Sequence, residues 1–148
     1  DIIKSINNNK KLIIRNPNHV RPWQHVLDPL MGYLILAEKQ YKNQIKDLEH
    51  SWNFGPSKDK FKKVIDVVKY IKKKEGLNYI LKDSNLLKET NVLKLNSFKA
   101  KKKLKWFCKW SLIETLNKTI EWNIQVKKGN SAKIVCEKQF LMHIDNNR

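Results

Sequence analysis

The chain has 148 residues, and its 31 lysines and arginines against 14 acidic residues give it a formal charge of +17. That length is enough for one domain with a hydrophobic core, whereas the longest apolar run, residues 29–37, is well short of the roughly 20 residues that a membrane span needs. The excess charge is mostly lysine scattered along the chain, while nucleic-acid sites usually gather lysine and arginine on one face. We therefore expect a solvated basic surface and neither a membrane nor a nucleic acid as partner.

The two cysteines, Cys108 and Cys136, have neither the spacing of a metal-binding pair nor the density of a secreted disulfide scaffold. They predict reduced thiols in a cytoplasmic protein. The four histidines show no zinc-binding pattern, so we expect no metal site.

The first predicted elements are a helix end over Asp1–Asn9 and a buried strand over Leu12–Arg15, which the turn residues Asn16–Asn18 stop. The first residue is aspartate, and the helix that it opens has no cap. We expect that the sequence begins inside a longer protein.

The segment from Arg15 to Ala37 contains Arg15 and Arg21, two of the three arginines in a chain that otherwise uses lysine. A guanidinium holds a phosphate or carboxylate through two parallel N–H donors, which lysine cannot do. Asp28 followed by Pro29 predicts a helix start, with the carboxylate as the cap. The helix should run to Tyr41, and its apolar spacing predicts as the buried side Leu30, Tyr33, Leu34 and Ala37.

Further elements follow in the same alternating manner. We predict a short strand over Ser51–Gly55 and a helix over Phe61–Lys74, which ends at Gly76 and has Val64, Val67, Val68 and Ile71 at helical spacing on its apolar side. A strand over Leu77–Leu81, a loop over 83–90 and an extended piece over Val92–Leu95 should follow. We then expect a helix capped by Ser97 that ends near Leu104, a helix from the capping box Ser111–Glu114 to about Val126 with Ile113, Leu116, Ile120 and Trp122 buried, and a last helix over Ile134–Ile144. Strands that alternate with helices indicate a mixed α/β fold.

Catalytic motifs are missing from this pattern. The four glycines are too far apart for a dinucleotide-binding turn, and there is neither a G-x-S-x-G elbow nor a P-loop. One Y-x-x-x-K match, Tyr70 to Lys74, lies on a lysine-rich amphipathic helix, and we interpret it as accidental. We predict no catalytic and no cofactor-binding residue in this chain.

Four blocks of sequence nevertheless carry a family resemblance. Residues 15–39, R-N-P-N-H-V-R-P-W-Q-H-V-L-D-P-L-x-G-Y-L-x-L-A-E-K, resemble a segment of the CDP-glucose 4,6-dehydratases, which are extended short-chain dehydrogenases/reductases. The likeness continues in the W-N-F-G-P of 52–56, in residues 88–95, similar to the family's H-E-A-x-x-L-x-L, and in residues 97–110, similar to its S-K-A-x-x-x-L-G-W-x-P-x-W.

The resemblance implies that residues 1–148 are the mixed α/β C-terminal substrate-binding portion of such an enzyme, without the N-terminal Rossmann core. The family's enzymes convert CDP-glucose to the 4-keto-6-deoxy sugar by transient reduction of NAD, which the absent portion would bind. The implied partners are a CDP-sugar, the missing half or a chain that supplies it, and further copies in a full-length homo-oligomer. The chain alone should be inactive.

Site residues are carried over from the same blocks. The resemblance makes Arg21 the diphosphate clamp, Asn53 a second diphosphate or ribose contact, and Arg15 and Trp23 pocket residues, while Glu89 takes the place of the H-E-A glutamate. For Trp23 a packing role, and for Asn53 a turn-satisfying role, stay open.

The sequence departs from the family pattern at three positions. Lys88 replaces the histidine of H-E-A, Lys105 the glycine of L-G-W, and Cys108 the proline of W-x-P. The first would alter the nucleotide pocket, and the other two would affect a turn near Trp106. A small basic module that binds nucleic acid through an extended lysine face is the alternative function.

Overall fold

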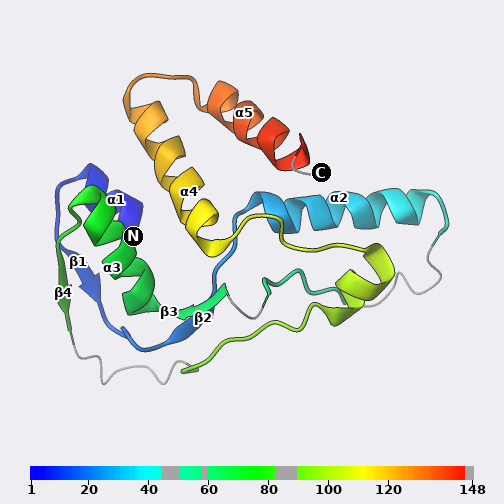
Figure 1. Cartoon of the computed structure of the whole chain (residues 1–148), viewed down its shortest axis with the longest axis horizontal. Helices are drawn as coiled ribbons and strands as arrows, with labels where there is room; N and C mark the ends of the chain where they lie inside the picture. The colour runs from blue at the N-terminus through cyan, green and yellow to red at the C-terminus, as the bar shows by residue number, and fades with distance from the viewer. Residues whose placement is uncertain (45–50, 58–59, 83–89, 146–148) are drawn as a thin grey trace. The chain divides into compact units, whose positions relative to one another are not determined.

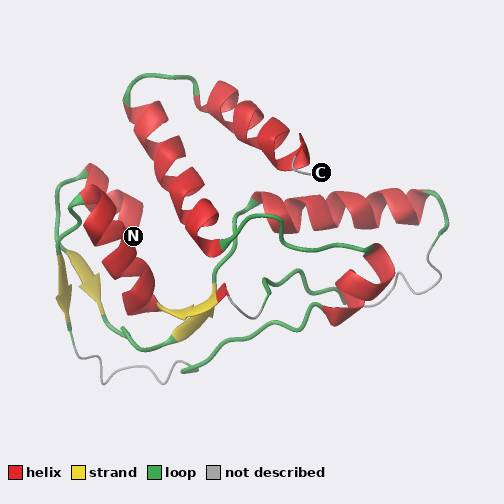
Figure 2. Ribbon diagram, in the orientation of Figure 1, coloured by secondary structure: helices red, strands yellow, loops and turns green. Residues whose placement is uncertain are grey.

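The computed structural model describes residues 1–44, 51–57, 60–82 and 90–145 (Figure 1). The chain folds into two compact units, the first made of Asp1–Pro22 and Phe61–Lys94 and the second of Trp23–Lys60 and Leu95–Arg148. Helices alternate with short strands (Figure 2), which confirms the mixed α/β class. None of the helices described here is both long and apolar enough to cross a membrane.

The first unit holds two small sheets and two helices. Its elements are α1 (Ile2–Asn7), β1 (Leu12–Ile14), β2 (Val20–Pro22), β3 (Phe61–Lys63), α3 (Val64–Glu75) and β4 (Tyr79–Leu81). Strand β1 pairs in parallel with β4, and β2 pairs antiparallel with β3. Val92 forms a parallel bridge to Val20, so the predicted extended piece runs along β2.

Helix α3 has the apolar side and the C-terminal end that its sequence predicts. The predicted apolar side of α3 is buried at Val67, Val68 and Ile71, and the helix ends at Gly76 in the left-handed conformation, with φ of 67°. The predicted start at Phe61 is wrong, because Phe61–Lys63 pair with β2 before the helix begins. Hydrogen bonding to a strand distant in sequence overrides the helical pattern there.

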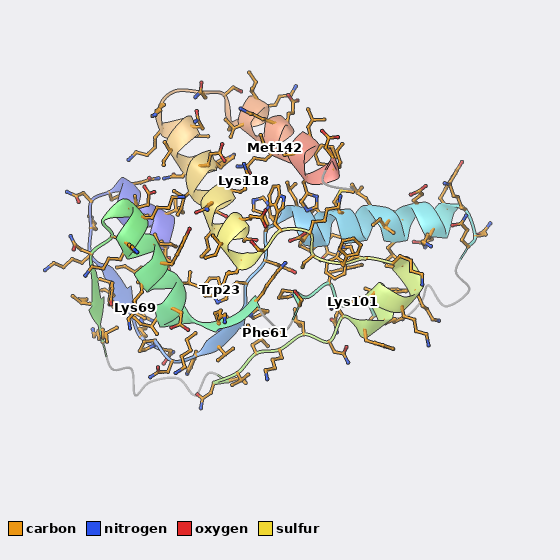
Figure 3. The ribbon with its side chains drawn as sticks, viewed as in Figure 1. Trp23, Phe61, Lys69, Lys101, Lys118 and Met142 are labelled. Atoms are coloured by element: carbon orange, nitrogen blue, oxygen red, sulfur yellow. The ribbon has the colours of Figure 1, made fainter. Side chains whose placement is uncertain are left out.

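The second unit is built from α2 (Leu27–Tyr41), the π-helix η2 (Ala100–Leu104), α4 (Leu112–Lys127) and α5 (Ala132–Asp145). A core cluster of Phe54, Ala100, Leu104 and Trp106 lies in this unit, and Ile35 and Leu36 of α2 pack against it. Helices α4 and α5 form a hairpin (Figure 1), in which the Lys118 Nζ of α4 lies 3.5 Å from the Met142 Sδ of α5 (Figure 3).

At the helix ends of the second unit, one predicted cap is confirmed and another is wrong. The capping box is confirmed: Glu114 N–H donates to Ser111 Oγ (3.2 Å), and Ser111 N–H donates to Glu114 Oε2 (2.7 Å). Ser97 is not a cap, because its hydroxyl donates to the Gly55 carbonyl, and Asn96 Oδ1 accepts the Phe98 N–H instead. Of the predicted buried side of α4, Leu116 and Ile120 are buried, whereas Ile113 is exposed and Trp122 half-buried.

Two further expectations are corrected in this unit. Residues 51–57 form no regular strand, although Phe54, Gly55 and Pro56 are buried. The predicted buried side of α2 faces solvent: Leu30, Tyr33, Leu34 and Ala37 are all exposed, while Asp28 and Gly32 are buried. The helix covers the predicted residues, but its apolar face points to solvent and not to the core.

Candidate functional site

Arg21 lies on β2 in the first unit and is half-buried. Its Nη1 donates to the carbonyls of Val20 (3.1 Å) and Thr90 (3.0 Å), and its Nη2 lies 3.0 Å from His19 Nδ1. These contacts hold the guanidinium in one orientation. The cross-strand partner of Arg21 is Lys62, and directly opposed residues share a face of a ribbon, so two cations lie on one side of the β2–β3 pair.

The other predicted residues of the first unit are less well defined. Arg15 is exposed on the bend that follows β1. Glu89 and the departure at Lys88 lie outside the described residues, directly before the Thr90 that contacts Arg21.

Trp23 and Asn53 belong to the second unit. Trp23 is half-buried, and its backbone N–H donates to the Lys60 carbonyl (3.3 Å). Asn53 is exposed between half-buried Trp52 and buried Phe54. Gln24 Nε2 donates to the Phe54 carbonyl (2.7 Å), which joins the R-P-W-Q block to the W-N-F-G block. This role of Gln24 was not predicted from the sequence, although its place beside Trp23 in a block of family resemblance was a signal.

Asp28 is the centre of the second unit and not a helix cap. The N-terminus of α2 has no side-chain cap, and Asp28 is fully buried. Its Oδ1 accepts the Lys109 N–H (2.9 Å) and a hydrogen bond from His143 Nε2 (3.0 Å), and its backbone carbonyl accepts the Trp106 Nε1–H (2.8 Å). The predicted cap is therefore wrong, because these distant partners hold the carboxylate inside the core.

Aromatic and imidazole rings pack beside this carboxylate. Trp110 makes edge contacts with His25 and with His143, at centroid distances of 4.6 and 4.9 Å. Burial lowers the pKa of His25 to about 4, so its imidazole is neutral at neutral pH, and its Nδ1 lies 3.3 Å from the Leu27 N–H. His25 thus has the environment of a packing residue.

Cys108 occupies the position of the family's proline. Its thiol donates to Gln24 Oε1 (3.3 Å), and burial raises its pKa to about 12. A thiol with this pKa is not a nucleophile at neutral pH. Among the residues that the structure describes, no group of three or more histidine, cysteine or acidic side chains could hold a metal ion.

A cavity of about 500 Å³ opens within the second unit, between the start of α2 and the α4–α5 hairpin. It is lined mainly by apolar surface, from Gln24, His25, Val26, Leu27, Thr119, Trp122, Cys136 and Gln139. Its size is that of a small-molecule or side-chain pocket.

The lysine runs do not share a unit. Lys72–Lys74 lie in the last turn of α3 in the first unit, and Lys101–Lys103 lie in η2 in the second. Within each helix such a run turns around the axis. Each unit by itself thus offers no extended lysine stripe from these runs.

Comparisons with known proteins agree with the sequence blocks. No protein-family model matches the chain. The CDP-glucose 4,6-dehydratase of Salmonella typhimurium (strain LT2) is 38% identical over 141 residues, and the match covers 94% of this chain and 39% of that protein.

Two solved structures show the same fold. The UDP-glucuronic acid 4-epimerase from Bacillus cereus in complex with UDP-glucuronic acid and NAD has a TM-score of 0.66 and 18% identity, over 84% of this chain and 38% of the epimerase. Its complex with NAD has a TM-score of 0.66 and 19% identity, over 88% and 39% of the two chains.

The chain spans about two fifths of the length of these proteins. Its resemblance to the CDP-glucose 4,6-dehydratases is confirmed: it is similar in sequence to such an enzyme, and its fold is that of the C-terminal part of extended short-chain dehydrogenase/reductase epimerases and dehydratases.

Proposed function

We propose that this chain is the sugar-nucleotide-binding C-terminal part of a CDP-glucose 4,6-dehydratase. The observation that carries the proposal is the 38% identity to a protein of that activity along 94% of the chain. The fold, shared with an epimerase that binds UDP-glucuronic acid and NAD, supports a sugar nucleotide as the ligand. NAD, held by the remainder of the enzyme, would supply a transient hydride acceptor, while residues of this chain would hold the nucleotide end of the substrate.

Arg21 is the residue proposed to contact the diphosphate. Its contacts with His19, Val20 and Thr90 orient the guanidinium before any ligand arrives, which lowers the entropy cost of binding. Its cross-strand neighbour Lys62 adds positive charge on the same face of the ribbon, and this charge favours an anionic ligand. A phosphate that uses Nη1 would compete with the Thr90 carbonyl.

The remaining proposed contacts keep the roles that the resemblance implies. Asn53 is exposed and therefore accessible to a diphosphate or ribose. Arg15 and Trp23 are proposed to line the nucleotide pocket, and Glu89 to contact the nucleotide from the segment beside Thr90.

The proposal is tested in a chimaera, in which this chain replaces the matched region of the Salmonella dehydratase. CDP-glucose is titrated into the chimaera and into its Arg21→Lys variant by calorimetry. Lysine keeps the charge but loses the paired donors, and because a hydrogen bond to a charged group contributes about 1.5 to 3 kcal/mol, affinity should fall by roughly tenfold to a hundredfold.

The matched control is Lys69→Gln, which removes an exposed positive charge from α3 in the same unit (Figure 3). It should bind CDP-glucose as the unchanged chimaera does, and circular dichroism confirms that all three proteins are folded. Equal affinities for the chimaera and its Arg21→Lys variant would remove Arg21 from the site. A folded chimaera that binds no CDP-glucose would overturn the proposed function.

The 148-residue chain alone is proposed to be inactive. It carries no glycine-rich dinucleotide turn, so we expect no dehydratase activity from it and no NAD binding in calorimetry. Micromolar NAD binding would contradict this expectation.

A further inference from the structure

The solvent-facing side of α2 is an apolar stripe. We call it the α2 outer face and define it by the exposed residues Val26, Leu30, Tyr33, Leu34, Ala37 and Tyr41. Their spacing follows the helical repeat over the length of α2, as is usual for a side that is buried against another element. None of the six is charged, in a chain in which 30% of the residues are.

The helix is not free to turn this face inward. A Cβ on residue 32 would lie 2.3 Å from Cδ1 of Phe54, so only glycine allows the Phe54 ring to pack this closely against the buried side of α2. The edge of the outer face also touches this ring, because Tyr33 makes an edge contact with Phe54 at a centroid distance of 5.2 Å. On the buried side the Asp28 carbonyl accepts the Trp106 Nε1–H, and the Asp28 carboxylate accepts the Lys109 N–H. Rotation that buried Leu34 would break both hydrogen bonds and expose a buried carboxylate.

The cavity of the second unit continues this face at its N-terminal end. Val26 and Leu27 line the cavity, together with Trp122 of α4 and Cys136 of α5. The amide of Gln139 at its wall is engaged by the Lys118 carbonyl, at 2.8 Å. An exposed apolar helix face with an apolar cavity at one end has the form of a protein interface, in which an anchoring side chain fills a pocket.

We propose that the α2 outer face and this cavity form the docking surface for the remaining part of a dehydratase chain. This inference rests on the proposed function. The Salmonella relative has about three fifths of its length outside the match, and that part is the segment available to cover a face that this chain leaves exposed. Because the face carries no charge, its occupant presents an apolar surface and neither a phosphate backbone nor an acidic peptide.

The test uses the part of the Salmonella dehydratase that lies outside the match. It is tagged and co-expressed with this chain, so that the two polypeptides fold together, and the amount of this chain that co-purifies is measured. The variant Leu34→Lys places a charge in the proposed interface and should lower recovery at least tenfold. Leu141→Lys is the matched control, since Leu141 is a helical leucine of similar exposure, 55% against 57%, on α5.

Recovery of the unchanged chain and of Leu141→Lys, with loss of Leu34→Lys, supports the proposal. Equal recovery of the two variants overturns it. So does failure of the unchanged chain to co-purify, whether the chain is monomeric or self-associates through Leu34 in sedimentation experiments; self-association would assign the face to a second copy. If Leu34→Lys does not fold by circular dichroism, Tyr41→Lys replaces it, because Tyr41 is 89% exposed.

The proposed function and this inference fail in different ways. A chimaera that binds CDP-glucose through Arg21, combined with co-purification that ignores Leu34, overturns the docking surface alone. Co-purification that depends on Leu34, combined with a folded chimaera that binds no CDP-glucose, overturns the proposed function alone.

Discussion

Arg21 and Asp28 come from the same block of sequence, and the two units use them in different ways. Asp28 in the second unit is fully buried, and its partners Lys109 and His143 come from distant parts of the chain. Arg21 in the first unit is half-buried, and its partners are the neighbouring His19 and Val20 and the exposed Thr90.

The difference separates a polar residue that supports the fold from one that is available to a ligand. A buried carboxylate must have its hydrogen-bond donors inside the protein, because leaving it unpaired is costly. A half-buried guanidinium on a ribbon keeps contact with solvent and can exchange a carbonyl partner for a phosphate. One block of sequence therefore contains a structural residue, Asp28, and a candidate binding residue, Arg21. The effect of replacing each residue on the unfolding free energy distinguishes the two roles.

The largest effect is expected from Asp28→Ala. It leaves the Lys109 N–H and the buried His143 Nε2 without their acceptor, and because each donor left unsatisfied costs about 1 to 3 kcal/mol, the unfolding free energy should fall by about 2 to 6 kcal/mol. Urea unfolding followed by tryptophan fluorescence measures the loss. Asp66→Ala, at an exposed aspartate in the first turn of α3, should lose less than about 1 kcal/mol. Similar losses for the two variants would show that Asp28 is not a structural centre.

Acidification should affect the same region next most strongly. The folded state lowers the pKa of His25 from 6.5 to about 4, so protonation of His25 favours the unfolded chain. Above pH 6.5 the titration of His25 does not lower the unfolding free energy. Between pH 6.5 and 4 the unfolding free energy falls, because the unfolded chain takes up the proton first, and the total loss is about 3 kcal/mol at most, at 1.36 kcal/mol per pKa unit.

The His25 contribution is measured as the difference in pH dependence between the unchanged chain and His25→Asn. Asparagine does not titrate, and its side-chain oxygen is placed to accept the Leu27 N–H as Nδ1 does. The unfolding free energy of the variant should fall less steeply between pH 6.5 and 4. Parallel curves would mean that His25 is more solvated than its packing against Trp110 indicates.

Lys105→Gly should stabilise the turn that leads to Trp106. Lys105 has φ of 57°, a left-handed conformation that suits glycine, and it stands where the L-G-W pattern of the resemblance has glycine. Replacement should raise the unfolding free energy by about 1 kcal/mol. Lys101→Gly, inside η2, should lower it by a similar amount, about 1 kcal/mol. A stability decrease in both variants would contradict the assignment of the Lys105 turn.

The smallest stability effect is expected from Arg21→Lys. Lysine keeps the charge and one donor for a backbone carbonyl, so the unfolding free energy should change by less than about 1 kcal/mol. Urea unfolding of the isolated chain measures it. A loss comparable with that of Asp28→Ala would make Arg21 a second structural centre, and its effect on CDP-glucose affinity would then need a structural explanation.

The sequence by itself determined the features that depend on near neighbours. The capping box at Ser111, the left-handed end at Gly76 and the buried valines of α3 were all predicted, because each involves groups within one or two helical turns. The blocks around Arg21 and Asn53 likewise identified candidate binding residues and the related family from residue identity alone.

Tertiary structure decided what lies inside and outside. The apolar spacing of α2 predicted a buried side, but Gly32 against Phe54 and Asp28 against Trp106 and Lys109 turned that side outward. Sequence pattern shows that a helix has an apolar face, and it does not show which of the chain's distant segments will pack on which side. For Asp28, the local sequence is the same whether the residue caps a helix or lies buried in the core. Only partners far along the chain distinguish the two cases, because a buried carboxylate is stable only where hydrogen-bond donors from those partners converge on it.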